Sequence, residues 1–588
     1  MRKFALSLLL FSLFPAEPSS ALAADPPLDL RRTPGEVAGA HQIKLIRQWK
    51  GDLCRSRLIN RGKAPVRIKE VVLFRVKHSL PPATALYAES FQMLSQTAGT
   101  LGHPVNIGYD ERRHYRIPQP DDATAVTGML TLTPPGGETI LLGFTSCRRF
   151  NGRFYLRPGS IEVVLDTENL ELAPGESWEL EEFLFAHGPV RPALLNRLAN
   201  EINRNHPPLR VPRPPTGWCS WYHFGRKVTA QNVLDNLDAI AKSLPELRYV
   251  QIDHGYEPAI GDWLETGTAF GGDVRSVLKT IRNRGFEPAI WVAPFVAEPG
   301  SHLFQQHPDW FMKDSSGKPL PSGEVTFQGW ENGPWYALDG THPEAQRYLE
   351  NLFRTMRRQW GASYFKLDAN FWGAMHGAKL HDPKATRIEA YRRGMEAILR
   401  GAGDCFVLGC NHPIWASFGL IHGSRSSADI SRDWRTFAKL ARQNLSRNWQ
   451  NGKLWWNDPD AVVLTGKQPE KEFRFHATMI LASGGMILSG DDLSQIPPDR
   501  LAMLRKLLPP TQTAAEFTDE TLRVGVVKLP DRDLVCVFNY TDAPESTAVQ
   551  LPRAGIVTEL WSGENLGRKS GVLQVDVPAR SAKVLVLH

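Results

Sequence analysis

The pattern of apolar and polar positions first separates an all-β region from the rest of the chain. From residue 25 to about 188, short runs of alternating or β-branched apolar residues, such as 161–165, lie between turn sequences, which predicts a series of strands. A helical pattern follows near 190–205, and the proline-rich stretch 207–215 marks a boundary. We therefore predict an N-terminal β-sandwich domain over residues 24–206.

The middle of the chain has a different pattern: short apolar runs that end in polar residues alternate with amphipathic helical segments. Eight such strand–helix units over residues 207–508 predict a (β/α)8 barrel. The stretch of about 296–340 is rich in Trp and poor in helical pattern, so we expect it to form a loop over the barrel mouth. The apolar runs are 217–221, 250–254, 289–294, 364–368, 406–411, 424–429, 454–458 and 486–492.

Two of the predicted barrel helices begin with capping signals. Asp273 precedes an apolar helical pattern that stops at Gly285. Thr341-His342-Pro343-Glu344 has the spacing of a capping box, with Thr341 as the cap and Pro in the first turn. After about residue 510 strand-like runs return, and we predict a small β-sandwich over residues 509–588. The predicted fold class is an α/β barrel flanked by two β-sandwich domains.

The first residues have the pattern of a secretory signal peptide. Arg2 and Lys3 precede the apolar run 4–14, and the small residues 21–23 resemble a cleavage site. We expect residues 1–23 to be removed and the mature protein to be secreted or periplasmic. No later segment approaches the roughly 20 apolar residues of a membrane span, so we expect no membrane partner.

Composition and charge narrow the choice of partners. The chain has 588 residues, with Lys+Arg 69 and Asp+Glu 62, which gives a formal net charge of +7. Because these charges are spread out rather than clustered, we expect no nucleic-acid partner. The six Cys are scattered without metal-ligand spacing, which argues against a disulfide scaffold and a zinc site. Neither a disulfide pairing nor the oligomeric state can be read from this sequence.

Carboxylates gather where the predicted barrel strands end, and this is the end at which such barrels carry their active sites. Lys366 is two residues before Asp368, and Arg425 is four before Asp429, so each cation shares a face with its carboxylate. Two carboxylates on separate strands can act as nucleophile and acid/base in glycoside hydrolysis, or the ion pairs can simply stabilise the top of the barrel. Asp433 is a second candidate for the acid. The strand-end carboxylates are Asp253, Asp368, Asp429, Asp458, Asp460, Asp491 and Asp492.

Around these residues the chain resembles the melibiase-type α-galactosidases of glycoside hydrolase family 36. Tyr364-x-Lys366-x-Asp368 and Arg425-x-x-x-Asp429 are similar to the nucleophile and acid/base signatures of that family. The resemblance extends over nearly the whole mature chain and implies an N-terminal β-supersandwich, a catalytic barrel and a C-terminal β-sandwich. The other similar segments are 89–94, 217–221, 251–253, 261–263, 307–310, 408–413 and 457–460.

The resemblance implies a retaining double displacement. Asp368 would attack the anomeric carbon, and Asp429 would protonate the leaving oxygen and then activate water, with the two carboxyl groups roughly 5–5.5 Å apart. Lys366 would bond the O3 and O4 hydroxyls of the sugar, and Arg425 would contact O2. Neither a metal ion nor an organic cofactor is needed. The expected substrate-binding residues are Trp221, Asp253, His254, Asp262, Trp263, Trp291, Lys366, Cys410, Arg425 and Trp434.

One position departs from the family pattern. Family members usually carry two adjacent Asp at the end of strand two, which accept hydrogen bonds from O4 and O6, whereas this chain has Asp253-His254. An imidazole offers one acceptor when neutral and none when protonated. Either His254 turns aside and water fills the gap, or the protein prefers another sugar. On the second hypothesis, His254→Asp should raise activity on simple α-galactosides.

The first functional hypothesis is an exported, exo-acting, retaining glycosidase. It would remove terminal α-linked galactose, or a close galacto-configured sugar, from an oligosaccharide or glycoconjugate. The alternatives are the same mechanism on another sugar (an α-N-acetylgalactosaminidase or a β-L-arabinopyranosidase), transfer to a second sugar, or a non-catalytic carbohydrate-binding protein. The presence of both Asp368 and Asp429 argues against the last, because binding alone needs neither a nucleophile nor a proton donor.

Overall fold

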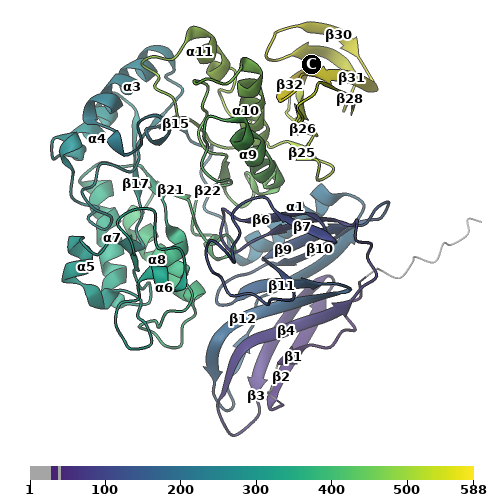
Figure 1. The fold of residues 1–588 in the computed structure, drawn as a ribbon, viewed down its shortest axis with the longest axis vertical. Helices are drawn as coiled ribbons and strands as arrows, with labels where there is room; N and C mark the ends of the chain where they lie inside the picture. Colours follow the sequence, from purple (N-terminus) through teal and green to yellow (C-terminus); the bar gives the residue numbers. More distant parts are fainter. Residues whose placement is uncertain (1–27, 38–40) are drawn as a thin grey trace, which may run out of the picture.

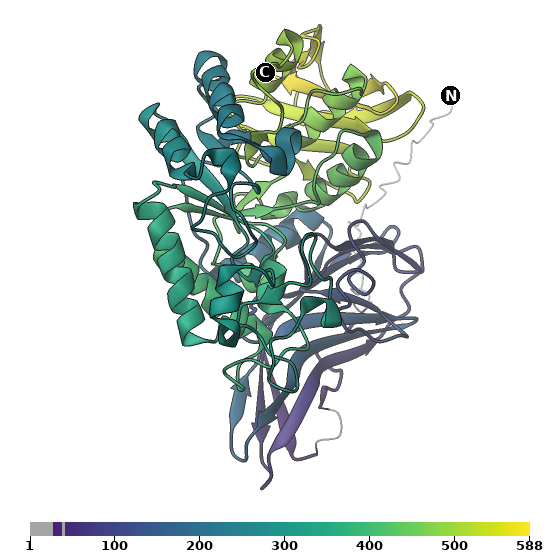
Figure 2. The same cartoon turned by 60° about the vertical axis from the view of Figure 1, so that its left-hand side comes forward.

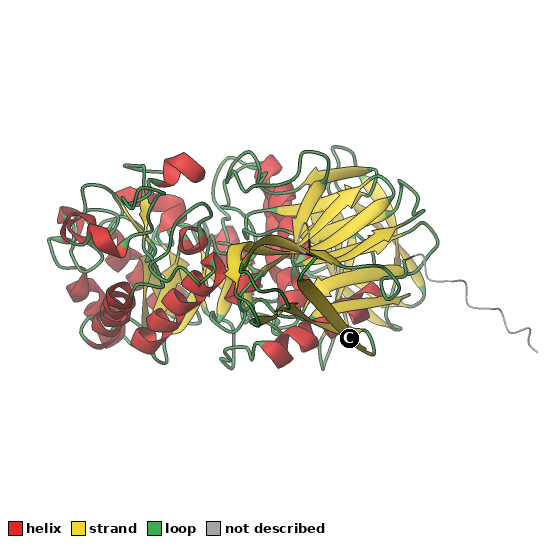
Figure 3. Ribbon diagram, turned by 90° about the horizontal axis from the view of Figure 1, so that it is seen from below, coloured by secondary structure: helices red, strands yellow, loops and turns green. Residues whose placement is uncertain are grey.

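The computed structural model describes residues 28–37 and 41–588 and shows a helix-covered barrel flanked by two β-rich regions (Figures 1 and 2). The N-terminal sheets (purple) and the C-terminal strands (yellow) both lie to the right of the barrel in Figure 1. Figure 3, seen from below, shows the helix-rich barrel on the left and large yellow sheets on the right. The predicted signal peptide, residues 1–23, falls outside the described residues.

The N-terminal region consists of two antiparallel sheets packed face to face. One has the order β1-β4-β12-β11-β8, and the other has the order β13-β3-β14-β10-β9-β5-β6-β7 with β2 paired to β3. Phe74 and Phe144 both lie with their ring centroids 5.3 Å from that of Phe183, which joins the two sheets through an aromatic core. The strands are β1 (Glu36–Val37), β2 (Ile43–Lys50), β3 (Leu53–Asn60), β4 (Val66–Lys77), β5 (Ala85–Glu89), β6 (Gln96–Thr100), β7 (His103–Asn106), β8 (Thr124–Thr127), β9 (Met129–Thr133), β10 (Thr139–Phe144), β11 (Asn151–Arg157), β12 (Ser160–Leu172), β13 (Ser177–Glu179) and β14 (Phe183–Gly188).

Helix α1 (Arg191–Asn205) leads from these sheets into the barrel, whose parallel strands have the order β23-β22-β21-β20-β17-β16-β15-β24. A single bridge between Val462 and Ser489 joins the region after β23 to β24, so the barrel is nearly closed. The strands are buried on both faces, which explains why they appear in the sequence as continuous apolar runs. They are β15 (Thr216–Cys219), β16 (Tyr249–Ile252), β17 (Glu287–Val292), β20 (Tyr364–Leu367), β21 (Phe406–Gly409), β22 (Gly423–Arg425), β23 (Trp456–Asp458) and β24 (Ile487–Ser489).

The helices around the barrel begin at identifiable caps. Asp273 caps α4 by accepting a hydrogen bond from the backbone N–H of Arg275 at 3.1 Å, as predicted. The prediction for α7 was wrong: His342 is the cap, and Thr341 instead donates its hydroxyl hydrogen to Asp339 at 2.7 Å. The helices are α2 (Trp221–Phe224), α3 (Ala230–Ser243), α4 (Val274–Asn283), α7 (Pro343–Arg358), α8 (Arg387–Ala402), α9 (Trp434–Ser446), α10 (Glu470–Ser483) and α11 (Pro498–Arg505).

The segment between β17 and α7 forms the long loop predicted over the barrel mouth. Two hydrogen bonds fix its tip: the indole N–H of Trp335 donates to the backbone carbonyl of Glu331 at 2.8 Å, and the side-chain amide of Asn332 donates to the Glu298 carboxylate at 3.0 Å. The tip is therefore held in one place although it contains little regular structure. Its short elements are β18 (Val296–Ala297), α5 (His302–Gln306), α6 (Ser322–Val325) and β19 (Tyr336–Ala337).

The C-terminal strands form a small sandwich, with one sheet in the order β25-β26-β27-β32-β29-β30 and a second made of β28 and β31. It packs on α10, where the indole N–H of Trp561 donates to the hydroxyl of Thr478 at 2.9 Å. Barrel, N-terminal sheets and C-terminal sandwich together confirm the predicted fold class. The strands are β25 (Glu516–Phe517), β26 (Val524–Lys528), β27 (Asp533–Asn539), β28 (Glu545–Gln550), β29 (Gly555–Glu559), β30 (Asn565–Lys569), β31 (Val572–Val577) and β32 (Ser581–Leu587).

A buried ion pair joins the N-terminal sheets to the barrel. The Arg447 guanidinium, 1% exposed, lies 2.6 Å from the Glu89 carboxylate, which is fully buried. Arg447 also donates to the carbonyls of Ser95 and Ser426, so it binds both regions at once. Among the helices that the structure describes, none combines the length and apolar character that a membrane crossing requires.

Candidate active site

A cavity of about 440 Å³ opens where the barrel strands end. Its lining combines four carboxylates, a lysine and two histidines with several aromatic rings. Side chains from the N-terminal region and from the long loop close it from above, so three parts of the chain contribute to one site. The lining residues are Leu94, Tyr109, His114, Tyr115, Trp221, Asp253, His254, Trp291, Phe327, Trp330, Glu331, Lys366, Asp368, Trp372, Cys410, Asn411 and Asp429.

Asp368 is held in the cavity wall by two hydrogen bonds. It follows β20, and one carboxylate oxygen accepts from the backbone N–H of Ala369 at 2.7 Å, while the other accepts from the indole N–H of Trp291 at 3.1 Å. Ala369 has a left-handed φ of +53°, a strained conformation of the kind found at active sites. Burial raises the pKa of Asp368, the charge of Asp429 raises it further, and Lys366 opposes both. The carboxylate is thus oriented and incompletely neutralised, which suits a nucleophile.

Asp429 lies on the more open side of the cavity. Its side chain is 64% exposed, and it accepts a hydrogen bond of 2.6 Å from Arg425, which is itself 1% exposed. The same guanidinium lies 2.7 Å from Asp460 and donates to the hydroxyl of Tyr222 at 2.9 Å. Arg425 therefore fixes Asp429 while leaving it open to solvent, an environment that allows proton exchange with a leaving group or with water.

The floor of the cavity is an ion pair. The ammonium of Lys366 lies 2.9 Å from Asp253, and both side chains are nearly inaccessible. Burial alone would raise the pKa of Asp253, but Lys366 holds it below its usual value. Gln251 and the thiol of Cys219 also donate to the same Asp253 oxygen, at 2.6 and 3.4 Å. This pair lies beneath any molecule bound in the cavity and remains charged.

His254 does not turn aside. It lines the cavity with its ring centroid 4.7 Å from that of Trp291 and 5.8 Å from that of Trp221. One ring nitrogen contacts Glu257, and the other lies 3.2 Å from Glu331. Burial lowers the pKa of His254, but the hydrogen bond and charge of Glu257, with the charge of Glu331, outweigh this, and the net shift is upward. Because a carboxylate in place of His254 would lie between two others, we now expect His254→Asp to lower activity, the opposite of the expectation from the sequence.

Two of the expected substrate-binding residues lie behind the cavity rather than in its lining. Trp263 is 1% exposed and packs edge-on against Trp291 at 5.7 Å, so it supports the wall from behind. Asp262 accepts hydrogen bonds from the backbone N–H groups of His302 and Leu303, at 3.2 and 3.3 Å, and so caps the first turn of α5. Neither side chain reaches the space that a sugar would occupy, and both expectations need this correction.

Arg425 and Trp434 also differ from expectation. Arg425 contacts Asp429 but does not line the cavity, so it acts as a positioning residue. Trp434 begins α9 and packs against Phe475 at 4.8 Å, away from the site. Asp433, the second candidate acid, caps α9 by accepting from the backbone N–H of Thr436 at 2.9 Å.

Sequence reasoning missed the upper wall of the cavity. Tyr109 and His114 come from the loop after β7, with ring centroids 4.5 Å apart, and His114 stacks on Phe327 of the long loop at 4.7 Å. Trp330 and Trp372 continue the aromatic surface, with centroids 6.0 Å apart. Rings of this kind can cover the apolar faces of sugars. The predicted Trp-rich loop over residues 296–340 placed Phe327 and Trp330 near the barrel mouth without identifying them, and the family-like segment 89–94 was the one signal from the N-terminal region.

The cysteines are not candidate nucleophiles. All six fall within the described ranges, where they are buried and unpaired with one another. Burial raises the pKa of both Cys219 and Cys410 well above its usual value, which disfavours the thiolate. In the described part of the chain, the side chains of Asp262, Glu265 and His302 are close enough to share a metal ion, but two of them are exposed and none lines the cavity.

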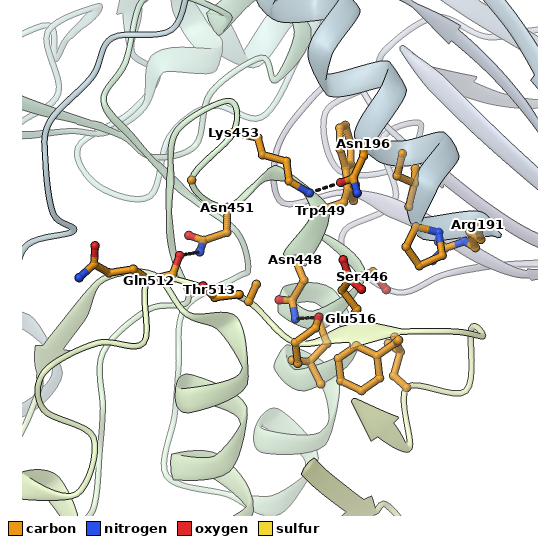
Figure 4. A pocket seen from close by; sticks show the side chains of 18 of the residues that line it. Arg191, Asn196, Ser446, Asn448, Trp449, Asn451, Lys453, Gln512, Thr513 and Glu516 are labelled. Carbon is orange, nitrogen blue, oxygen red and sulfur yellow. Dashed lines mark hydrogen bonds between the residues drawn. The ribbon is translucent and has the colours of Figure 1, made fainter. Parts of the chain in front are cut away.

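A second cavity, of about 410 Å³, lies where α1, the segment 445–456 and the segment 512–522 meet (Figure 4). Its polar side chains are largely engaged with the protein itself. Asn448 donates to the carbonyl of Ala515 at 2.9 Å, Asn451 donates to that of Gln512 at 3.3 Å, and Lys453 contacts Asn196. The space is therefore best described as a joint between regions of the chain, and the carboxylate chemistry lies in the first cavity.

A (β/α)8 barrel with two carboxylates and aromatic walls at its strand ends has the architecture of a glycoside hydrolase. The family model described as Melibiase matches residues 253–398, which include His254, Lys366 and Asp368. Over these residues the chain is similar to the melibiase family, whose members are α-galactosidase-type glycoside hydrolases.

Individual relatives show a similarity of the same kind over part of the chain. The chain is 30% identical over 168 residues to the myogenesis-regulating glycosidase of Mus musculus, a match that covers 28% of this chain and 22% of the relative. It is 30% identical over 112 residues to an α-galactosidase of Escherichia coli, covering 19% of this chain and 14% of the relative. The chain thus spans less than a quarter of the length of these curated relatives.

Among solved structures, an α-galactosidase from Thermus thermophilus in complex with p-nitrophenyl α-D-galactopyranoside shares the fold. Its TM-score is 0.61 at 23% identity, with 84% of this chain and 98% of that chain covered. The same enzyme has been solved in complex with stachyose.

Proposed function

We propose that the protein is an exported, retaining, exo-acting glycosidase that removes terminal α-linked galactose, or a close galacto-configured sugar, from an oligosaccharide or glycoconjugate. The observation that carries this proposal is the contrast between two carboxylates in one cavity. Asp368 is enclosed and hydrogen-bonded to Trp291, while Asp429 is exposed and fixed by a buried Arg425. Environments this different assign different roles to the two groups.

In the first step, an Asp368 oxygen forms a bond to the anomeric carbon as the bond from that carbon to the leaving oxygen breaks. Asp429 gives its proton to the leaving oxygen in the same step. In the second step, Asp429 takes a proton from water, and the water oxygen attacks the anomeric carbon and releases Asp368. Lys366 and Asp253, paired at the cavity floor, offer a donor and an acceptor to sugar hydroxyls. Export rests on the signal-peptide pattern of residues 1–23.

The choice of a galacto-configured sugar rests on similarity. The related barrel from Thermus thermophilus binds an α-galactoside and stachyose, and the family model that matches residues 253–398 is that of melibiases. The cavity of about 440 Å³ has room for one or two sugar rings, as exo-acting cleavage requires.

The test is the hydrolysis of a panel of p-nitrophenyl glycosides: α-D-galactoside, α-N-acetyl-D-galactosaminide, β-L-arabinopyranoside and α-D-glucoside. We expect the α-galactoside to lead and Asp368→Asn to reduce its turnover by several orders of magnitude. Azide should rescue an Asp368→Gly variant, because a small anion can take the place of the missing carboxylate. A lead by one of the next two substrates would revise the sugar and keep the mechanism. Sugar binding without turnover of any substrate by the wild type would overturn the enzymatic proposal, and transfer products in place of free galactose would show a transglycosylase.

A further inference from the structure

The cavity contains a fourth carboxylate that the double displacement does not use. Asp253 is neutralised by Lys366, and Asp368 and Asp429 have chemical roles, but Glu331 has none. Glu331 belongs to the long loop rather than to a barrel strand, and its side chain is 18% exposed. It therefore lies in the cavity wall with part of its surface available to a bound molecule.

Glu331 is held in place by two cations and by its own backbone. One oxygen lies 2.5 Å from the Arg226 guanidinium and 3.2 Å from a ring nitrogen of His254. The carbonyl of Glu331 accepts from Trp335 at 2.8 Å, and the next residue, Asn332, donates to Glu298. Both cations address the same carboxylate oxygen, Oε2, and no hydrogen bond between side chains within the described residues involves Oε1. The carboxylate is thus oriented with acceptor capacity left over.

His254 cannot supply that capacity itself. Its two ring nitrogens face Glu257 and Glu331, so both are engaged with carboxylates. A doubly engaged, protonated imidazole has donors only. A hydroxyl group that approaches His254 therefore finds its acceptor on the neighbouring Glu331, and His254 and Arg226 act as positioning residues for that carboxylate.

The barrel order shows which end of a sugar meets this wall. His254 follows β16, and Asp429 follows β22, and these strands are four places apart in an eight-stranded barrel, which puts them on opposite sides of the mouth. Asp429 must lie at the bond that breaks. The wall of His254 and Glu331 therefore faces the end of the sugar ring remote from the anomeric carbon, which in a galactopyranoside carries the hydroxyls at C4 and C6.

We propose that Glu331 is a specificity-determining residue that accepts a hydrogen bond from the C4 or C6 hydroxyl of the terminal sugar. This inference rests on the proposed function and names a substrate class: neutral glycosides with a free hydroxyl at that end of the ring. It assigns to the long loop a role that the sequence pattern placed at the end of strand two.

The test compares how much activity the same variant loses on each of several substrates. kcat/KM is measured for the wild type and Glu331→Gln on p-nitrophenyl α-D-galactoside, its 4-deoxy and 6-deoxy analogues, and the β-L-arabinopyranoside, which lacks C6. Loss of a hydrogen bond to a charged group should lower kcat/KM on the galactoside roughly 10- to 100-fold. The loss should shrink to about threefold or less on the analogue that lacks the contacted hydroxyl. Glu324→Gln, an exposed glutamate in the same loop and outside the cavity, should change none of these values.

An equal fold-loss on all four substrates would overturn the inference, because it would mean that Glu331 only supports the loop. Glu331→Asp keeps the charge with a shorter reach and provides a second variant should Glu331→Gln unfold. If the wild type turns over none of the substrates, calorimetric binding of D-galactose and 6-deoxy- and 4-deoxy-D-galactose gives the same comparison. If Glu331→Gln then weakens the binding of D-galactose more than that of one deoxy analogue, this inference holds although the proposed activity fails. If the wild type does not bind galactose, both proposals are overturned.

Discussion

Replacing His254 with Asp should damage the site rather than improve it. The imidazole lies 3.2 Å from Glu331 and in contact with Glu257, with only 3% of its side chain exposed. Two unit charges at 3.2 Å attract by about 5 kcal/mol at an effective dielectric constant of about 20. Removing one partner from a buried ion pair lowers the free energy of unfolding by about 3–5 kcal/mol, because the remaining charge stays buried without a partner. His254→Asp also adds a third negative charge, so the full loss of about 3–5 kcal/mol in unfolding free energy is expected.

The assay is urea unfolding followed by Trp fluorescence, together with kcat/KM on an α-galactoside. His254→Gln is the matched control, since its amide can still donate, and we expect a smaller loss of about 1–3 kcal/mol. The sign of the pH dependence is fixed by the raised pKa of His254. The stabilisation by protonated His254 is fully present below the unfolded pKa of about 6.5 and is lost as pH rises through the higher folded pKa. The difference in unfolding free energy between the wild type and His254→Gln should therefore become smaller at alkaline pH. A His254→Asp protein that is as stable as the wild type and more active on simple α-galactosides would refute this reasoning.

Three further predictions concern other charged groups. Lys366→Met should lower the unfolding free energy by about 3–5 kcal/mol, because it leaves Asp253 buried without its cation. The double variant Lys366→Met/Asp253→Asn should unfold at a higher urea concentration than Lys366→Met alone. Because the pKa of Asp368 is raised and the residue must be ionised to attack, kcat/KM should fall as pH drops through a value above the ordinary aspartate pKa of about 4. Asp429→Asn, assayed on a p-nitrophenyl substrate that needs little acid assistance, should shift this fall in kcat/KM to lower pH, because the charge of Asp429 raises the pKa of Asp368. A fall at the same pH as in the wild type would show that the two charges do not interact. Arg447→Met should lower the unfolding free energy by about 3–5 kcal/mol, since it leaves Glu89 buried without its cation between the N-terminal sheets and the barrel; a thermal melt checks this.

The fold was largely predictable because its signals are local. Each barrel strand is an apolar run because parallel strands are covered on both faces, and this shows in the sequence without knowledge of the neighbours. The cap at Asp273 was predictable for the same reason, since it bonds a residue two positions away. The cap of α7 was not, because Thr341 is drawn into a turn with Asp339 and leaves capping to His342.

The site was best predictable where its residues lie at the ends of the barrel strands or just after them. Asp368, Asp429 and Lys366 reach the cavity because the ends of parallel strands meet at one edge, whereas Asp262 and Trp434 were assigned from motif position and lie elsewhere. Residue type and spacing could not distinguish a side chain in the cavity lining from one that caps a helix nearby.

By itself, the sequence determined the order of domains, the barrel, and the carboxylates at its strand ends. Periodicity and strand-end position require only neighbours along the chain. The tertiary structure decided what surrounds those carboxylates: Glu331 meets His254 across 77 residues, and the rings of Tyr109 and His114 come from a separate region of sheets. Such contacts depend on where long loops and other domains pack, and their partners are too distant in sequence for any local pattern to show. The properties of His254 are therefore set by the tertiary structure, because charges brought close by folding, and not the residue type, fix its protonation and its role.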